Sequence, residues 1–407
     1  MIGAGSDPWA PGTTIGVLGG AHDARVDRVG VLAPRAAGWE LEWWIGADDR
    51  WRIPAREAAV RGQLVDGMPV VQTSMRVPGG DAVHRVYGAP VPDVGEVAVV
   101  EIANESPAPF VAALVVRGAG AVDLDGRVAF IDSRPALCTA RPPSRWAMTF
   151  DGTTEEIVVR GDASDAPFAP RRDRAARLVA AFLYPVAHRT ALRAMVALGP
   201  RGLGGVGLPD LPDAAAVARG WRVQLDRGMR VELPDEGLQR AVDTARAATV
   251  LAGQAWKVDP DVAAALEDWG FDAEAAGAWT RLSGRERRRI ARRRPEAGSW
   301  TQVRATTERP DARLLAAVRT ALVRERDTEI EVASVWPTEW IGLPVDVRDA
   351  PTRRGPVSWS VRWHADRPAL LWDGPADVRF TAPGLDAAWS STEASGETLL
   401  AASSSPT

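Results

Sequence analysis

The sequence is short of several residue types on which many protein sites depend. Its 407 residues contain one cysteine, four histidines and, among 49 Lys and Arg residues, a single lysine, Lys257. The lone Cys138 excludes an intramolecular disulfide and a thiolate metal cage. No two histidines stand at a metal-ligand spacing such as H-x-x-x-H. The sequence therefore predicts no metal site and no cofactor.

Long apolar runs and a strong net charge are also missing. No apolar stretch approaches the ~20 residues of a membrane-spanning helix. The first residues lack the basic segment and apolar core of a signal peptide. The net charge of -4 indicates no dedicated surface for nucleic acid or membrane. We therefore expect a cytoplasmic protein without a nucleic-acid or membrane partner.

Arginine is concentrated in one short run. Arg285–Arg294 holds seven arginines in ten residues. Binding to nucleic acid through phosphate neutralisation is one interpretation. On a helical wheel, however, Arg287 and Arg294 lie opposite the others, and no aromatic residue is interleaved. An exposed helix face that pairs with acidic residues elsewhere is the interpretation that we favour.

The residues before about position 200 have the pattern of an antiparallel β domain. Short alternating or β-branched segments are separated by turn signals such as Pro78–Asp81 and Asp125-Gly126. About ten strands at this spacing predict a large antiparallel sandwich. The predicted strands are Leu41–Ile45, Pro69–Val77, Ala82–Tyr87, Val97–Ala103, Phe110–Val116, Val128–Ile131, Arg145–Phe150, Glu156–Arg160, Leu178–Pro185 and Thr190–Leu198.

A Gly/Pro-rich segment, residues 199–212, follows the predicted sandwich. It contains a G-x-G-x-x-G formed by Gly202, Gly204 and Gly207. A dinucleotide site needs these glycines between a strand and the helix that holds the pyrophosphate. Because Pro209 and Pro212 follow instead, we interpret the segment as a flexible linker.

The pattern then changes to helices and afterwards returns to strands. Aspartates stand at helix starts, and apolar residues recur at helical spacing. The predicted helices are Ala214–Arg227, Glu236–Ala252, Asp261–Trp269, Ala273–Leu282, Ser283–Arg294 and Asp311–Arg326. The later predicted strands are Glu329–Val335, Val345–Val347, Ser358–Trp363, Ala369–Trp372, Val378–Thr381 and Leu399–Ala401.

These patterns predict an α+β multidomain fold. We expect a large antiparallel N-terminal β-sandwich over residues 1–199 and a linker with a helix over residues 200–233. A truncated bundle of α-helical hairpins would span residues 234–327. A small C-terminal β-sandwich would span residues 328–407.

Tryptophan is unusually frequent, with 17 Trp against 2 Tyr and 7 Phe. In a strand over residues 39–46, Trp39, Leu41 and Trp43 share one face, and Trp44 lies on the other face with Glu40 and Glu42. An indole beside carboxylates is typical of sugar binding, because the ring stacks on the sugar and the acids accept its hydroxyls. Core tryptophans with a solvated outer face are the alternative. The candidate substrate-binding residues are Trp44, Asp48, Asp49, Trp51 and Trp269.

A second group of tryptophans lies near the C-terminus. Trp359 and Trp363 alternate with Val361 and so share one strand face. We interpret this group as part of the core of the small sandwich. Its members are Trp336, Trp340, Trp359, Trp363 and Trp372.

Hydrolysis of a glycosidic bond requires two carboxylates about 5–9.5 Å apart. Glu267 and Asp268, directly before Trp269, are the candidate catalytic pair. Adjacent helical residues face different ways, so their spacing alone does not make them a pair. Asp259 and Asp261 fit a helix cap better than a catalytic role.

The order of these parts resembles the six-hairpin glycosidases, such as glucoamylase-like, trehalase-like and debranching enzymes. Four stretches resemble a bacterial branch of that group: Trp43–Trp51, Gly79–Tyr87, Leu233–Ala248 and Val361–Trp372. The resemblance implies a sandwich, a linker helix and an (α/α)6 toroid with two catalytic carboxylates. A toroid needs roughly 250 residues, whereas Pro234–Asp327 offers 94 residues. The toroid would therefore be shortened.

Two functions follow as expectations. The first is a protein of glycoside-hydrolase-like descent that acts on or binds a glycan or oligosaccharide; if active, it would use acid/base carboxylates. The second is a non-enzymatic structural protein that self-assembles. Helical faces left uncovered by the short helical block would then form a homo-oligomer.

Overall fold

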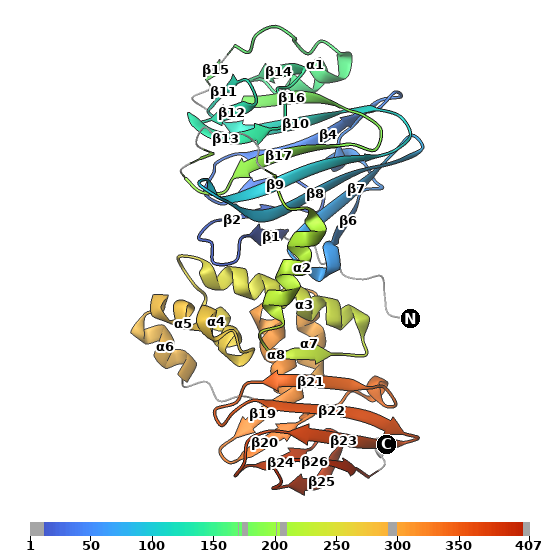
Figure 1. The fold of residues 1–407 in the computed structure, drawn as a ribbon, viewed down its shortest axis with the longest axis vertical. Coiled ribbons are helices and arrows are strands. Elements are labelled where there is room, and N and C mark those ends of the chain that lie inside the picture. The colour runs from blue at the N-terminus through green and yellow to red at the C-terminus, as the bar shows by residue number, and fades with distance from the viewer. Residues whose placement is uncertain are drawn as a thin grey trace. The chain divides into compact units, whose positions relative to one another are not determined.

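The computed structural model describes residues 12–169, 171–172, 178–200, 202–203, 210–291 and 299–401. Within these ranges the protein has an α+β multidomain fold, with four β-sheets and eight α-helices (Figure 1). It divides into two compact units, whose described parts are residues 12–220 and 221–401. We call them the N-terminal unit and the C-terminal unit and describe each by itself.

Two large antiparallel sheets form the N-terminal unit. In spatial order, the described strands of sheet A are β1 (Thr13–Gly16), β2 (Asp23–Val26), β3 (Leu32–Pro34), β4 (Glu40–Gly46), β10 (Phe110–Ala119), β16 (Leu178–Val186) and β14 (Arg145–Thr149), with β5 (Trp51–Arg52) paired to β4. Those of sheet B are β15 (Arg171–Arg172), β11 (Ala121–Asp125), β12 (Val128–Ile131), β13 (Arg134–Thr139), β17 (Ala191–Ala197), β9 (Gly95–Glu105), β8 (Gly80–Val91), β7 (Val70–Val77) and β6 (Arg61–Leu64). Two short 3-10 helices, η1 (Pro54–Arg56) and η2 (Val65–Gly67), flank β6.

Strand β4 shows how the sequence pattern produces this sandwich. Leu41, Trp43 and Ile45 are buried in the apolar core between the sheets. Glu40 is exposed and Glu42 is half-buried on the opposite face. The predicted alternation along this strand is confirmed.

The outer face of sheet A is covered by a helix that the sequence pattern did not predict. Glu156–Arg160 was expected to be a strand, but it belongs to α1 (Thr154–Arg160). The segment ends at Gly161, whose left-handed backbone (φ 81°) closes the helix by donating to the carbonyls of Ile157 and Val158. Val158 packs into a second apolar cluster on this face. Tertiary packing and a glycine stop signal therefore outweigh the β-branched residues of the segment.

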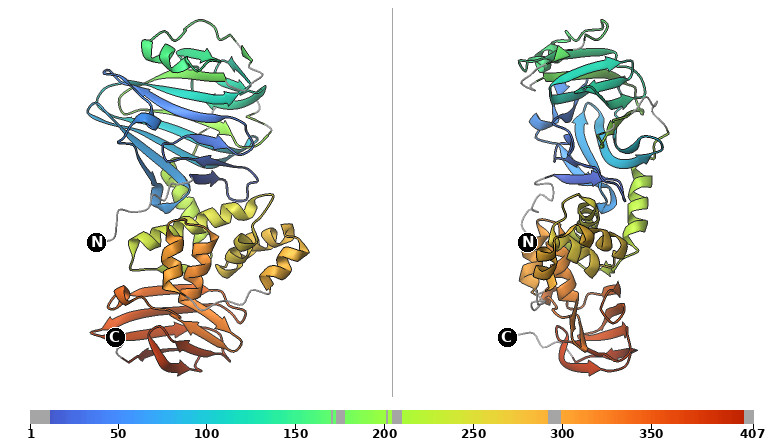
Figure 2. Two further views of the ribbon diagram at one scale, coloured as in Figure 1. Left: turned by 180° about the vertical axis from the view of Figure 1, so that it is seen from behind. Right: turned by 90° about the vertical axis from the view of Figure 1, so that its left-hand side faces the viewer.

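Helices and two smaller sheets form the C-terminal unit, and they gather at opposite ends of it (Figure 2). The described helices after residue 213 are α2 (Ala214–Leu225), α3 (Glu236–Gln254), α4 (Pro260–Asp268), α5 (Asp272–Arg281), α6 (Gly284–Ala291), α7 (Trp300–Thr307) and α8 (Ala312–Leu322), with the 3-10 helix η3 (Thr338–Trp340). The described strands of sheet C are β18 (Arg230–Glu232), β21 (Val345–Ala350), β22 (Val357–His364), β23 (Arg367–Asp373) and β26 (Ser395–Leu399). Those of sheet D are β19 (Val323–Arg326), β20 (Glu329–Val332), β24 (Arg379–Ala382) and β25 (Asp386–Ser391).

The helix starts follow the predicted caps. The side chain of Asp235 accepts a hydrogen bond from Leu238 N (3.0 Å), and Asp259 caps α4 in the same way. Asp311, which was expected to be the first residue of the last helix, is instead the residue that caps α8. The apolar faces of α3, α4, α5 and α8 are buried within the unit. Self-association through these helical faces therefore gains no support from exposed apolar surface.

Several elements of this unit differ from the predictions, and strands β18 and β25 were not predicted at all. The helix expected over Asp311–Arg326 ends at Leu322, because Val323 has an extended backbone and begins β19. The predicted Leu399–Ala401 strand lies earlier, as β26. Helix α7 was not predicted. The predicted helix Ser283–Arg294 is observed as α6, and residues 292–294 lie outside the described ranges.

The C-terminal tryptophans occupy the interior only in part. Trp340, Trp359 and Trp372 are buried, as predicted. Trp336 and Trp363 are only half-buried. Trp340 packs edge-on against another indole, that of Trp300, with 4.5 Å between the ring centroids.

The resemblance to the six-hairpin glycosidases is wrong. Strands make up 41% of the structure and helices 25%, and the described helices do not form an (α/α)6 toroid. Strand β18 precedes helices α3 to α8 and pairs with β21, which follows them. Helices α3 to α8 are therefore inserted between two paired strands of sheet C within this unit. The division into four domains at residues 199, 233 and 327 stays a prediction.

No helix among the described residues is both long enough and apolar enough to cross a lipid bilayer.

Candidate functional site

The turn between β4 and β5 brings together three of the predicted sugar-binding residues. Ala47 N donates to Arg50 O (3.2 Å) and closes this turn, which places Asp48 and Asp49 at its exposed tip. Gly46 then pairs with Trp51 across the two strands. A Cβ added to Gly46 would lie 2.8 Å from the Trp51 indole, so the ring lies directly over this glycine. Trp51 is half-buried, with one side on the protein.

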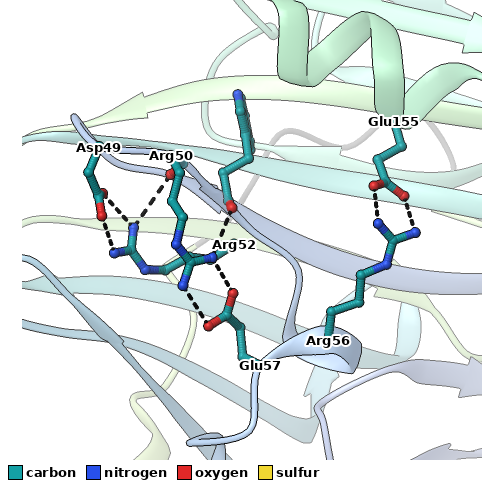
Figure 3. A network of polar contacts seen from close by, with 7 residues as sticks. Asp49, Arg50, Arg52, Arg56, Glu57 and Glu155 are labelled. Atoms are coloured by element: carbon teal, nitrogen blue, oxygen red, sulfur yellow. Dashed lines mark hydrogen bonds and ion pairs between the residues drawn. The ribbon is translucent and has the colours of Figure 1, made fainter.

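Three arginine–carboxylate pairs surround this turn (Figure 3). Arg52 donates to both oxygens of Asp49, at 2.6 and 2.8 Å. Arg50 donates to both oxygens of Glu57, with one bond of 2.9 Å. A third bidentate pair joins η1 to α1, described next. We use the name β4–β5 surface for Trp51 together with the three pairs, which are Arg52–Asp49, Arg50–Glu57 and Arg56–Glu155.

The third pair joins segments far apart in the sequence. Arg56 in η1 donates to both oxygens of Glu155 in α1, with one bond of 2.7 Å. The two residues are 99 positions apart. No sequence motif indicates this partner, so Glu155 was not among the predicted site residues. Arg52, Arg56 and Glu57 were missed for the same reason.

The arginines keep the carboxylates of this surface charged. The hydrogen bond from Arg52 lowers the pKa of Asp49 from 3.8 to about 2. The hydrogen bond from Arg50 lowers the pKa of Glu57. At neutral pH both groups are therefore ionised acceptors, and neither carries a proton to donate.

Trp44, a further predicted sugar-binding residue, lies behind this surface. Its ring is 1% exposed and belongs to the cluster that α1 covers. Its Nε1 donates to Glu42 (3.1 Å), and Glu42 also accepts from Arg117 Nε (2.6 Å). Trp44 therefore supports the sheet and offers no ring face to a ligand.

The predicted catalytic pair and Trp269 lie in the C-terminal unit. Trp269 is fully buried, its Nε1 donates to Leu315 O (3.0 Å), and Arg246 lies over its ring. Glu267 is exposed and accepts a hydrogen bond from Trp279 Nε1 (2.9 Å). Its neighbour Asp268 is also exposed, which leaves Trp269 as a core residue beside two surface acids.

The environment of Asp268 favours its protonated form. Although the side chain reaches solvent, desolvation by the protein around it raises its pKa. Arg319 opposes this shift, and Glu267 adds to it. A raised pKa is typical of a general acid, but it also results from simple packing beside a like charge. The catalytic role of Glu267 and Asp268 stays a prediction.

One surface groove of the N-terminal unit has a volume of about 480 Å³. Two arginines, Arg141 and Arg193, stand among its mainly apolar residues. Arg193 is already paired with Glu101 (2.8 Å), and Arg141 donates to Pro185 O. Another groove, of about 230 Å³, is lined by residues that include Trp39 and Asp132. Neither groove includes a predicted site residue.

Across the part of the chain that the structure describes, no three His, Cys, Asp or Glu side chains come together as metal ligands would. No protein-family model and no curated protein matches this sequence.

Proposed function

We propose that the N-terminal unit binds a glycan on the β4–β5 surface. The observation that carries the proposal is the half-buried Trp51 ring, which rests on Gly46 beside three arginine–carboxylate pairs. The ring supplies an apolar plane for one face of a sugar. The paired side chains supply a rim of acceptors and donors at fixed positions.

The ion pairs suit hydroxyl recognition because they hold both partners rigid. A bidentate guanidinium–carboxylate pair is planar, and each partner keeps hydrogen-bonding capacity beyond the pair itself. Adjacent sugar hydroxyls donate to a carboxylate and accept from a guanidinium. Since the side chains are already ordered, less conformational entropy is lost when the sugar binds.

Binding without hydrolysis is the form of the proposal that fits these charges. Hydrolysis needs one carboxyl group that keeps its proton until it protonates the leaving oxygen. The arginines lower the pKa of Asp49 and Glu57, so neither group serves as that acid at neutral pH. We therefore expect a bound sugar to be released unchanged.

Titration calorimetry of the full chain with soluble α- and β-glucans and with trehalose tests the proposal. We expect binding by the parent protein and an affinity at least about tenfold lower for Trp51→Ala, a loss of ~1.4 kcal/mol. Trp256→Ala is the matched control, because Trp256 is a tryptophan 94% exposed in the other unit. Its affinity for the sugar should equal that of the parent.

Asp49→Asn examines the rim separately from the ring. It leaves the indole in place and weakens the pair with Arg52. A smaller loss of affinity than in Trp51→Ala is expected. The proposal is refuted if no glucan or trehalose binds, or if Trp51→Ala binds as tightly as the parent.

A further inference from the structure

Trp256 is the most exposed tryptophan among the described residues. It lies in the turn between α3 and α4 and is 94% exposed. Burying an indole is strongly favourable, so a tryptophan left almost wholly in water stands out. The neighbouring Lys257 is also exposed.

Helix α6 brings more positive charge to this turn. Lys257 lies close enough to α6 to lower the pKa of Glu286, after the larger effects of hydrogen bonds from Ser283 and of the nearby Arg289. Packing holds the pieces together: α6 contacts α4, and Arg281 at the end of α5 donates to Gly253 O near the end of α3. The indole, the lysine and the arginine-rich helix therefore share one region of the C-terminal unit.

Three arginines of α6 form a stripe on this helix. Arg285, Arg288 and Arg289 are spaced i, i+3 and i+4, so they share a face, and all three are exposed. No described side chain forms an ion pair with any of them. Arg287 points back instead and donates to Leu282 O (3.1 Å).

The acidic residue of α6 is already engaged in the helix start. Glu286 accepts from Ser283 N (2.8 Å) and Ser283 Oγ (2.6 Å), and its backbone N–H lies 3.4 Å from Ser283 Oγ. This is a capping box, which satisfies the first turn of the helix. Its carboxylate is thus held at the helix start, and the stripe remains positive.

We propose that this surface, formed by Trp256, Lys257 and the three α6 arginines, binds single-stranded nucleic acid. Bases of any sequence stack on an exposed indole, and the cations neutralise the phosphates between them. The arginine run alone lacks an aromatic residue, which favoured a solvated face in the sequence. The fold supplies that aromatic residue from the α3–α4 turn.

Two other polyanionic partners fit the surface less well. The carboxylates of an acidic peptide would pair with the arginines. They would leave the exposed Trp256 ring without a stacking partner. A membrane surface would need an apolar stripe on α6, and Ile290 and Ala291 are its only apolar residues apart from Gly284. Nucleic acid uses both features, the ring and the charges.

Fluorescence anisotropy of the full chain with labelled oligothymidine and oligouridine at low salt tests this inference. We expect binding whose log affinity falls linearly with log salt, by roughly 0.7 per phosphate contact. Trp256→Ala should lose about tenfold in affinity, whereas Trp256→Phe should retain most of it. Arg288→Ala should weaken binding and lower the salt slope.

Controls separate stacking from charge alone. Trp51→Ala, at the β4–β5 surface, should bind the oligonucleotides as the parent does, so the two proposals fail independently. Polyglutamate and anionic vesicles serve as competitors. The inference is overturned if the oligonucleotides do not bind, if Trp256→Ala binds them equally well, or if either competitor displaces them as efficiently as unlabelled oligonucleotide.

Discussion

The two compact units place polar groups in their interiors very differently. Apolar side chains fill the space between sheets A and B, and the buried polar exceptions there include His84 and Thr73. In the C-terminal unit, the buried arginines Arg246, Arg319 and Arg324 are part of the interior. The N-terminal unit also buries Arg52, which pairs with Asp49, but the core between its sheets depends mainly on close packing. The C-terminal unit depends also on hydrogen bonds from three buried arginines.

The partners of these arginines explain their role. Arg319 donates to three backbone carbonyls. They belong to Asp268 at the end of α4, Val323 at the start of β19, and Pro351 just after β21. Orphan carbonyls at helix ends need donors. Arg324 forms a bidentate pair with the buried Glu331, with both bonds at 2.7 Å. Buried arginines thus join helices to strands within this unit.

Close packing in the N-terminal unit is most easily broken at Gly88. A Cβ at this position in β8 would overlap the backbone of Gly16 in β1 of the facing sheet. Backbone cannot move aside as a flexible side chain does. We expect Gly88→Ala to destabilise the unit by about 3 kcal/mol or more, measured by urea unfolding. Gly38→Ala is the control, because nothing lies within 4 Å of a Cβ there; equal effects of both variants would contradict this account.

Buried hydrogen bonding in the C-terminal unit is tested at Arg319. Arg319→Met keeps much of the side-chain volume but leaves three carbonyls without this donor. We expect a loss of about 2–3 kcal/mol in the unfolding free energy. Arg304, which pairs with Glu339 on the surface, supplies the control Arg304→Met with a much smaller loss. If Arg319→Met leaves the unfolding free energy unchanged, the three carbonyls accept hydrogen bonds from water instead.

The buried histidine makes the stability of the N-terminal unit depend on pH. His84 is 2% exposed and stacks on Trp43, with 4.8 Å between ring centroids. Desolvation lowers its pKa from 6.5 to about 3. Between these values the unfolded chain binds a proton that the folded chain does not, so stability falls as the pH drops through that window.

Replacing this histidine should remove that dependence. Below pH 6.5 the unfolding free energy of the parent should fall by ~1.4 kcal/mol per pH unit because of His84. Between pH 7 and pH 5 we therefore expect the parent to lose about 2 kcal/mol more unfolding free energy than His84→Phe. Urea unfolding at several pH values measures the difference. His364→Gln, at an exposed histidine, is the control and should keep the slope of the parent. Parallel pH profiles for His84→Phe and the parent would sink the idea.

Local signals were sufficient for some of these features. The aspartate caps at residues 235 and 259 and the alternation of β4 depend on neighbouring residues, and both predictions are confirmed. Other features depend on distant partners. Pairing of β18 with β21 across the helices, and of Arg56 with Glu155, leaves no periodic pattern.

The misassigned elements have the same cause. Residues 156–160 contain apolar residues that fit either a strand or one turn of a helix, and packing on sheet A decides between them. The last helix is shorter than predicted. The chain after it forms β19, in which Arg324 pairs with Glu331 of the neighbouring strand β20. The sugar-binding residues were predicted from their residue types alone. Trp44 and Trp269 are buried because α1 and α8 pack over them, and the spacing of residues in the sequence does not predict that packing.

The ion pair of Asp49 gives the smallest expected effect, and it tests how the two units use their arginines. Asp49 is an exposed carboxylate that pairs with the buried Arg52, whereas Glu331 and Arg324 are both buried. Since the pKa of Asp49 is lowered to about 2, the pair contributes stability above pH 3.8 and loses it as the pH falls toward 2. Carbon-13 NMR titration of Arg52→Gln should move the midpoint of Asp49 back toward 3.8.

The neighbouring acid provides an internal control for that titration. Glu57 owes its lowered pKa mainly to Arg50, so its midpoint should stay low in Arg52→Gln. The melting temperature at neutral pH should change little in Asp49→Asn, because exposed pairs are screened by water. A midpoint for Asp49 that remains near 2 without Arg52 would mean that backbone donors, and not the guanidinium, hold the carboxylate charged. The rim of the β4–β5 surface would then be ordered by the turn itself, and its arginines would be free to bind the ligand.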